Sequence, residues 1–301
     1  MLQRLWPPLV LAALAASWGF IPVIVREVSL SSGQLAASRI WLATLFQFAV
    51  LALWRGVRVP KTSRRSIVFS GLLLPLHWFT FFEAIETTRV LVALVLVFVA
   101  APLVTLAATK VLGEPLALIT GLAVVGGFIG AALAVDPANG ATTEGVLWAL
   151  ASGVLFAVML LQVKPAAADL GALQFGAWQG FVSSLVTLPW AVSAVPNIDG
   201  DLPLVLFLGI GLTGISGLIY LATMYRVPMS VLGSIMYVEP MAAVVAAWLL
   251  LDEDPGGRGW IGIALVVAFG AVVGWSNERA ARVVGDLGAG VSLRPESDRP
   301  S

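Results

Sequence analysis

The sequence predicts an all-α membrane protein of ten transmembrane helices, arranged as two inverted repeats of five helices each. Three observations lead to this fold class. First, 59% of the residues are hydrophobic and only 11% are charged, so the chain has too little polar surface to cover a water-soluble globule. Second, the apolar residues form stretches long enough to cross a bilayer as helices. Third, the second half of the chain weakly repeats the first.

The apolar stretches are roughly 17 to 25 residues long, the length that an α-helix needs to cross the hydrocarbon core. Runs such as residues 91–104 are apolar on every side, which excludes the alternating pattern of a membrane β-barrel. In chain order, the expected helices span residues 7–25, 35–54, 67–86, 90–110, 116–135, 145–163, 171–191, 202–224, 229–251 and 260–276.

The first apolar segment has one competing interpretation. Small residues at 13–15 resemble the cleavage site of a secretory signal peptide. We reject that interpretation because the first segment has a counterpart later in the chain, and its removal would leave half of the architecture unpaired.

The loop charges predict the orientation in the membrane. The loop between the second and third segments carries five basic residues, Arg55, Arg58, Lys61, Arg64 and Arg65. Basic loops favour the cytoplasmic side, so we expect a multi-pass protein of the inner or plasma membrane with both termini in the cytoplasm. A minority of basic residues then falls on the outer side: Arg26, Arg39, Arg89 and Arg258.

Self-similarity at about half the chain length indicates an internal duplication. Residues 96–115 resemble residues 235–255, with Pro102 opposite Pro240. Because five segments per half is an odd number, the second half must enter the membrane upside down relative to the first. The predicted domains are residues 7–135 and residues 145–276, followed by a polar, disordered cytoplasmic tail at residues 285–301.

Two GxxxG patterns occupy corresponding places in the two halves. Gly126 and Gly130 lie in the fifth segment, and Gly270 and Gly274 lie in the tenth. This spacing lets helices approach closely. We expect packing within a monomer, and a weak homodimer is the alternative.

Several motifs together resemble one transporter superfamily. They are ASWG at 16–19, LHWFTFFEAIETT at 76–88, APLVTLAATKVLGEP at 101–115 and VEPMAAVVAAWLLLDEDP at 238–255. With these motifs, the chain resembles the drug/metabolite transporter superfamily, specifically its EamA-type members with ten helices and two EamA repeats. The resemblance implies a pseudo-twofold bundle around a central cavity and a secondary transporter that works by alternating access.

Among the ionisable side chains inside apolar segments, where such groups are usually functional, His77 and Glu239 are the candidate site residues. His77 either lines the cavity, binding substrate or carrying a proton, or is a neutral histidine bonded to a neighbouring helix. Glu239, beside Pro240, either binds a proton or an ammonium group, or is a protonated acid bonded to backbone freed at the proline. For both residues, the two interpretations stay open.

Five aromatic residues are candidates for the cavity lining: Trp18, Trp78, Phe82, Tyr220 and Tyr237. Such rings stack on apolar substrates or hold a cation over a ring face. At about 100° per residue, Trp78 and Phe82 share one helix face and His77 lies on the next.

The resemblance implies export of small metabolites such as amino acids, and the aromatic lining favours hydrophobic or aromatic ones, as in exporters of the YddG type. Proton coupling through Glu239 or His77 is a hypothesis. The alternatives are a lipid or lipid-linked sugar flippase and an integral membrane enzyme. We expect no enzyme, cofactor or metal, because the chain has one histidine, no cysteine and no evident activated nucleophile. The zero net charge gives no indication of nucleic acid binding.

Overall fold

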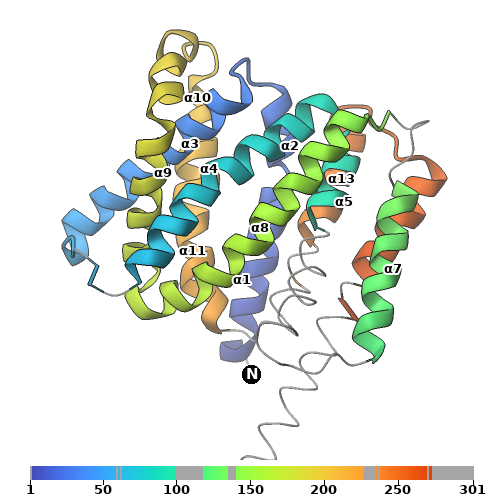
Figure 1. Cartoon of the computed structure of the whole chain (residues 1–301), viewed down its shortest axis with the longest axis horizontal. Coiled ribbons are helices and arrows are strands. Elements are labelled where there is room, and N and C mark those ends of the chain that lie inside the picture. The colour runs from blue at the N-terminus through green and yellow to red at the C-terminus, as the bar shows by residue number, and fades with distance from the viewer. Residues whose placement is uncertain are drawn as a thin grey trace, which may run out of the picture.

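All the regular structure that could be assigned is helical (Figure 1). The structure is a computed structural model, and it describes residues 2–58, 60–61, 63–98, 118–134, 140–226, 235, 238–269 and 271–272. Within these ranges, each of the ten expected apolar segments contains helix. The predicted fold class is therefore confirmed. The predicted tail at 285–301 lies outside the described residues.

The first half begins with two short helices where one was expected. The helices of this half are α1 (Leu2–Trp18), α2 (Ile21–Arg26), α3 (Ser32–Val50) with the π-helical turn η1 (Leu51–Arg55), α4 (Arg64–Thr87), α5 (Val90–Phe98) and α7 (Leu118–Ala134). A capping box starts α3, since the Ser31 hydroxyl accepts from Gln34 N and the Gln34 side chain accepts from Ser31 N.

The second half follows the same order of segments. Its elements are α8 (Thr143–Leu170), α9 (Ala172–Ala194), η3 (Val195–Asn197), α10 (Leu202–Leu206), η4 (Phe207–Ile215), α11 (Ser216–Thr223), η5 (Met224–Arg226), α13 (Val238–Leu250) and the helix Gly256–Phe269. Gly171 alone separates α8 from α9, with a φ of 81° that favours glycine.

The packing of helices repeats when the two halves are exchanged. The second segment of one half packs on that of the other, α3 against α9, and the fourth segments pair as α5 against α13. The contact of α4 with α9 is matched by that of α3 with η4. The contact of α5 with α8 is matched by those of α1 and α2 with α13. Since α1 starts at the end of the bundle opposite to the start of α8 (Figure 1), the halves are inverted.

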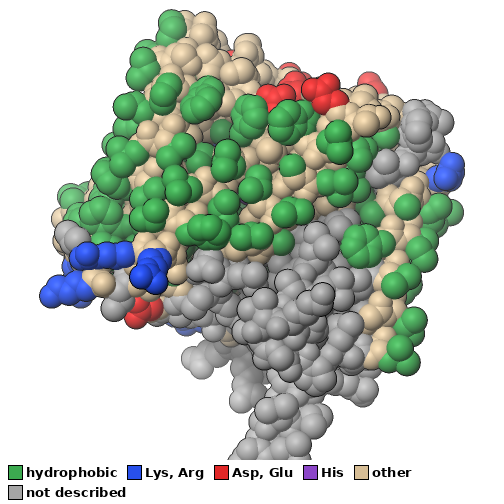
Figure 2. Space-filling view, in the orientation of Figure 1, with side chains coloured by type: hydrophobic (Ala, Val, Ile, Leu, Met, Phe, Trp, Pro, Cys, Tyr) green, Lys and Arg blue, Asp and Glu red, His purple; other side chains and the backbone are tan. Residues whose placement is uncertain are grey.

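Charged side chains gather at the two ends of the bundle. Figure 2 shows most of the visible acidic groups along one edge, most of the visible Lys and Arg groups at the opposite corner, and a broad hydrophobic face between them. We call the first edge the acidic end; it includes the end of α2 with Glu27, the start of α8 with Glu144 and the residues before α10 with Asp201 (Figure 1). The apolar face is what lipid chains require, and it includes exposed leucine and valine side chains on α8 and α9.

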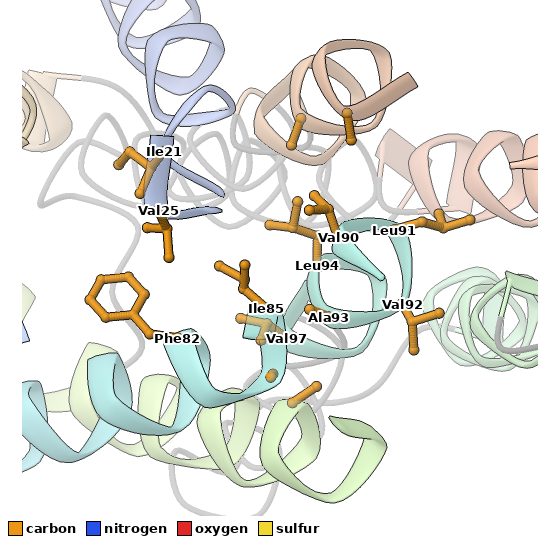
Figure 3. Close-up of a cluster of buried hydrophobic side chains, with 14 of the residues drawn as sticks. Ile21, Val25, Phe82, Ile85, Val90, Leu91, Val92, Ala93, Leu94 and Val97 are labelled. Atoms are coloured by element: carbon orange, nitrogen blue, oxygen red, sulfur yellow. The ribbon is translucent and has the colours of Figure 1, made fainter. Parts of the chain in front are cut away.

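A layer of apolar side chains fills the bundle beneath the acidic end (Figure 3). We call it the apolar layer. Its members come from α2, α4 and α5, and all are at most 8% exposed: Ile21, Val25, Phe82, Ile85, Val90 and Leu94.

The glycine pair in α7 packs against another helix of the same chain. A Cβ added to Gly130 would stand 2.8 Å from Gly262 O and 2.9 Å from Leu265 Cβ, so the helices nearly touch there. Gly126 faces the ring of Phe269 in the same way. Here this GxxxG pattern serves packing within the chain. Gly270 and Gly274, its predicted counterparts, lie outside the described residues.

Candidate functional site

The first transmembrane segment is interrupted near the middle of the bundle. It was expected to be continuous over residues 7–25, but the structure ends α1 at Trp18 and starts α2 at Ile21. Pro22 lacks the N–H that would continue the hydrogen-bond ladder, which favours the break. Interrupted helices in transporters commonly border the substrate site.

Gly19, at this break, lets the chain lie directly on α13. A Cβ at Gly19 would meet Glu239 O at 2.8 Å and Ala242 Cβ at 2.7 Å. The break therefore lies beside Glu239, in the first turn of α13.

Trp18 connects the same break to α11. Its indole Nε1 donates to Ser216 Oγ at 2.8 Å, and its ring centroid lies 5.2 Å from that of Tyr220. Two aromatic rings from opposite halves of the chain thus form a pair at the interface of the repeats.

Arg39 is the residue that sequence reasoning missed. It was counted among outer loop charges, but the structure buries it to 3% exposure on α3. Its Cζ lies 4.5 Å from the centroid of the Trp78 ring and 5.3 Å from that of Phe82. The predicted shared face of Trp78 and Phe82 on α4 is thus the face that meets Arg39. Its position inside the apolar segment 35–54 was the sequence feature that could have identified Arg39 as a membrane-embedded charge.

The π-helical stretch η4 supplies the hydrogen-bond partner of Arg39. Thr213 Oγ1 accepts from Arg39 Nε at 3.2 Å and from Nη2 at 3.0 Å, and its hydroxyl donates to Leu208 O at 2.7 Å. This last bond reaches back five residues, as the wider π turn allows. Such π-helical segments are frequent at functional sites.

Glu239 and Arg39 approach this region from opposite halves. Each acts electrostatically on the other, and Glu239 also acts on Tyr220. The two charges nevertheless form no direct ion pair, in contrast to Arg26 and Glu253 elsewhere in the described residues. We call the group the central cluster; its members are Trp18, Arg39, Trp78, Phe82, Thr213, Ser216, Tyr220 and Glu239.

Three polar groups of the central cluster have no hydrogen-bond partner among the described residues. In the described part of the chain, the only enclosed side-chain nitrogen or oxygen without a hydrogen-bond partner is Trp41 Nε1. Arg39 Nη1, the Glu239 carboxylate and the Tyr220 hydroxyl make no hydrogen bond to any described residue. Buried polar groups normally have partners, so these three groups are the candidates to bind a ligand.

His77 lies apart from the central cluster. Its Nδ1 is 2.8 Å from Ser152 Oγ and 3.1 Å from Ser152 O, and its ring stacks on Phe156 at a centroid distance of 4.9 Å. Ser152 Oγ also lies 3.2 Å from His77 O. The side chain therefore joins α4 to α8, as in the interpretation of a neutral histidine bonded to a neighbouring helix.

The acidic end is held closed by ionic contacts between the halves. Glu253 lies 3.5 Å from Arg26 and 3.8 Å from Arg89, and it accepts from Val90 N at 3.0 Å. Arg26 also donates to Thr88 O at 2.6 Å. We call Arg26, Arg89 and Glu253 the ion cluster; it covers the apolar layer.

Of the predicted site residues, the structure brings together Trp18, Trp78, Phe82, Tyr220 and Glu239. Tyr237 lies outside the described residues. Within the described ranges, no three His, Asp or Glu side chains are grouped so that they could hold a metal ion. The arrangement offers binding through charge, hydrogen bonds and ring faces.

Comparison with known proteins agrees with this architecture. The model of the EamA-like transporter family matches twice, at residues 5–135 and 143–274. The threonine/homoserine exporters RhtA of Salmonella typhimurium strains SL1344 and LT2 are each 26% identical over 272 residues, which is 83% of this chain and 90% of theirs. One solved crystal structure aligns with a TM-score of 0.66 at 18% identity, covering 92% of this chain and 98% of that one, and it supports the fold.

Proposed function

We propose that this chain, which belongs to the EamA-like transporter family, is a secondary transporter that exports small metabolites by alternating access. One observation carries the proposal. The central cluster takes charged, hydroxyl and aromatic side chains from both halves, and Arg39 Nη1 and the Glu239 carboxylate make no hydrogen bond to any described residue. Such a group between two inverted repeats is suited to bind a substrate while the halves move against each other.

Amino acids are the proposed cargo. The exporters RhtA, which are similar over most of this chain, carry threonine and homoserine in their names. The rings of Trp18, Tyr220, Trp78 and Phe82 favour hydrophobic or aromatic side chains over the small polar ones of those substrates.

The predicted halves, residues 7–135 and 145–276, would be the moving units. The positive-inside rule supports a cytoplasmic position for the basic loop and for both termini. The acidic end would then face outward, and the ion cluster would close the outer side.

The function is tested with purified protein in liposomes loaded with unlabelled substrate. We expect saturable counterflow of labelled leucine, phenylalanine or threonine, weakened in Trp78→Ala protein that remains folded. Protein-dependent uptake that does not saturate, or equal uptake in empty liposomes, would refute a carrier function.

Proton coupling is tested in the same vesicles. A transport rate that depends on an imposed pH gradient in the wild type, but not in Glu239→Gln protein, would support coupling through Glu239. A rate that is independent of pH in the wild type, in Glu239→Gln and in His77→Ala protein would refute it.

A further inference from the structure

Two ionisable side chains of opposite sign in the central cluster, Arg39 and Glu239, form no ion pair with each other. Arg39 is 3% exposed and comes from α3 in the first half, and Glu239 comes from α13 in the second half. A buried charge without a partner is strongly unfavourable. The pair therefore favours a ligand that brings one charge of each sign.

The remaining donors of Arg39 fit a carboxylate. Its Nε and Nη2 share one acceptor, Thr213 Oγ1, so Nη1 stays unused among the described residues. A planar guanidinium binds a carboxylate through two parallel N–H groups. The Trp78 ring packs against this guanidinium, with Arg39 Cζ 4.5 Å from the ring centroid.

The Glu239 carboxylate fits an ammonium group. It accepts no hydrogen bond from any described residue, so its oxygens can accept from an ammonium group. The Trp18 and Tyr220 rings pack against each other at a centroid distance of 5.2 Å, and Glu239 acts electrostatically on Tyr220. Ring faces attract cations and apolar groups alike.

We propose that Arg39 and Glu239 form the two poles of a binding site for the zwitterionic head of a free α-amino acid. The substrate carboxylate binds Arg39, its ammonium group binds Glu239, and its side chain packs against the aromatic rings. This inference rests on the proposed transport function and adds the requirement that both charged groups of the substrate be free.

The test compares competitors in counterflow of labelled phenylalanine, leucine and threonine. Free amino acids should compete at least about ten-fold better than their methyl esters, which lack the carboxylate, and their N-acetyl forms, which lack the ammonium charge. Esters and N-acetyl forms that compete as well as free amino acids would overturn the proposal and leave the transport function standing.

Variants assign each pole. Arg39→Met protein should no longer prefer the free amino acid over its methyl ester, but should still prefer it over the N-acetyl form. Glu239→Gln protein should no longer prefer the free amino acid over the N-acetyl form, but should still prefer it over the ester. Where Arg39→Met does not fold, Arg39→Lys keeps the charge without the planar fork and should lower the preference over the ester. Glu86→Gln, which removes an exposed carboxylate of α4, should leave both preferences unchanged. Unchanged preferences in folded Arg39 and Glu239 variants would overturn the assignment.

Failure of the inference and failure of the function give different results. A wild-type protein that counterflows none of the three amino acids overturns the two-pole site. The same vesicles are then assayed with simple amines and simple carboxylates. Saturable counterflow of an amine or a carboxylate would support the carrier function without the two-pole site. If none of the probes shows counterflow, both the carrier function and the two-pole site are refuted.

Discussion

The guanidinium of Arg39 lies over the face of the Trp78 ring, with Cζ 4.5 Å from the ring centroid. Arg39 belongs to the second transmembrane segment and Trp78 to the third, so this contact joins two helices of the first half. A desolvated contact of this kind contributes about 2 kcal/mol. It orients the only arginine of the central cluster.

Replacing Trp78 should therefore weaken substrate binding by disordering Arg39. We expect Trp78→Ala to raise the half-saturating substrate concentration in counterflow at least about ten-fold, which corresponds to a loss of somewhat over 1 kcal/mol. Trp78→Phe keeps a weaker ring face and should give an intermediate value. An unchanged half-saturating concentration in folded Trp78→Ala protein would show that the ring does not serve the site.

Gly19→Val should destabilise the protein, because added side-chain atoms at Gly19 meet Ala242 Cβ and the backbone of α13. Overpacking of this kind costs about 1 to 3 kcal/mol or more. The measurement is thermal unfolding of the purified protein in detergent, with Gly217→Val as the matched control. No atom lies within 4 Å of a Cβ placed on Gly217. Equal unfolding temperatures for the two variants would contradict the close approach of α1 and α13.

Glu253→Gln should loosen the acidic end, because one substitution removes both ion pairs of the ion cluster. We expect the free energy that favours the closed over the open state to fall by about 1 kcal/mol, which raises the open population roughly five-fold. The chain has no cysteine, so a single cysteine introduced at Ile85 in the apolar layer reports on opening alone. Its labelling by a membrane-impermeant maleimide should become several-fold faster.

Asp252→Asn is the control for this experiment. Asp252 is one residue away and has a φ of 54°, which asparagine also adopts readily. Labelling that is equally slow in the Glu253→Gln and Asp252→Asn backgrounds would show that the ion cluster does not hold the end closed.

Ser152→Ala should lower stability with little effect on transport, because Ser152 joins α8 to His77 outside the central cluster. Loss of these hydrogen bonds costs about 1 kcal/mol. Ser70→Ala is a suitable comparison, since Ser70 is also fully buried but bonds only within α4. Transport that fails in stably folded Ser152→Ala protein would instead assign His77 a part in the transport cycle.

The sequence predicted the membrane helices well, because apolar length is a property of the local chain. The sequence predicted the structure less well at positions where a contact between distant segments determines the conformation or the burial of a residue. The break between Trp18 and Ile21, which Pro22 favours, lies where α13 approaches Gly19. Arg39 stands near the start of its segment and resembles a loop charge until Trp78 and Thr213 are seen around it.

His77 and Trp78 show the same limit in a single helix. They are neighbours in sequence, but one residue is a turn of about 100°, so their side chains face different partners. Trp78 contacts Arg39, and His77 contacts Ser152. Helical periodicity separated the two faces correctly, and only the packed structure reveals which face meets the charged site.

The π-helical stretch η4 makes the two halves unequal. Its counterpart by repeat is α4, which is α-helical from Arg64 to Thr87. In a carrier with identical halves, the inward-facing and outward-facing states would mirror each other and be equally populated. A wider helix in only one member of this pair removes that symmetry, and it does so beside Thr213, which binds Arg39. For the proposed transporter, the inward-facing and outward-facing states are therefore not mirror images, and part of the difference lies in the backbone of the eighth transmembrane segment.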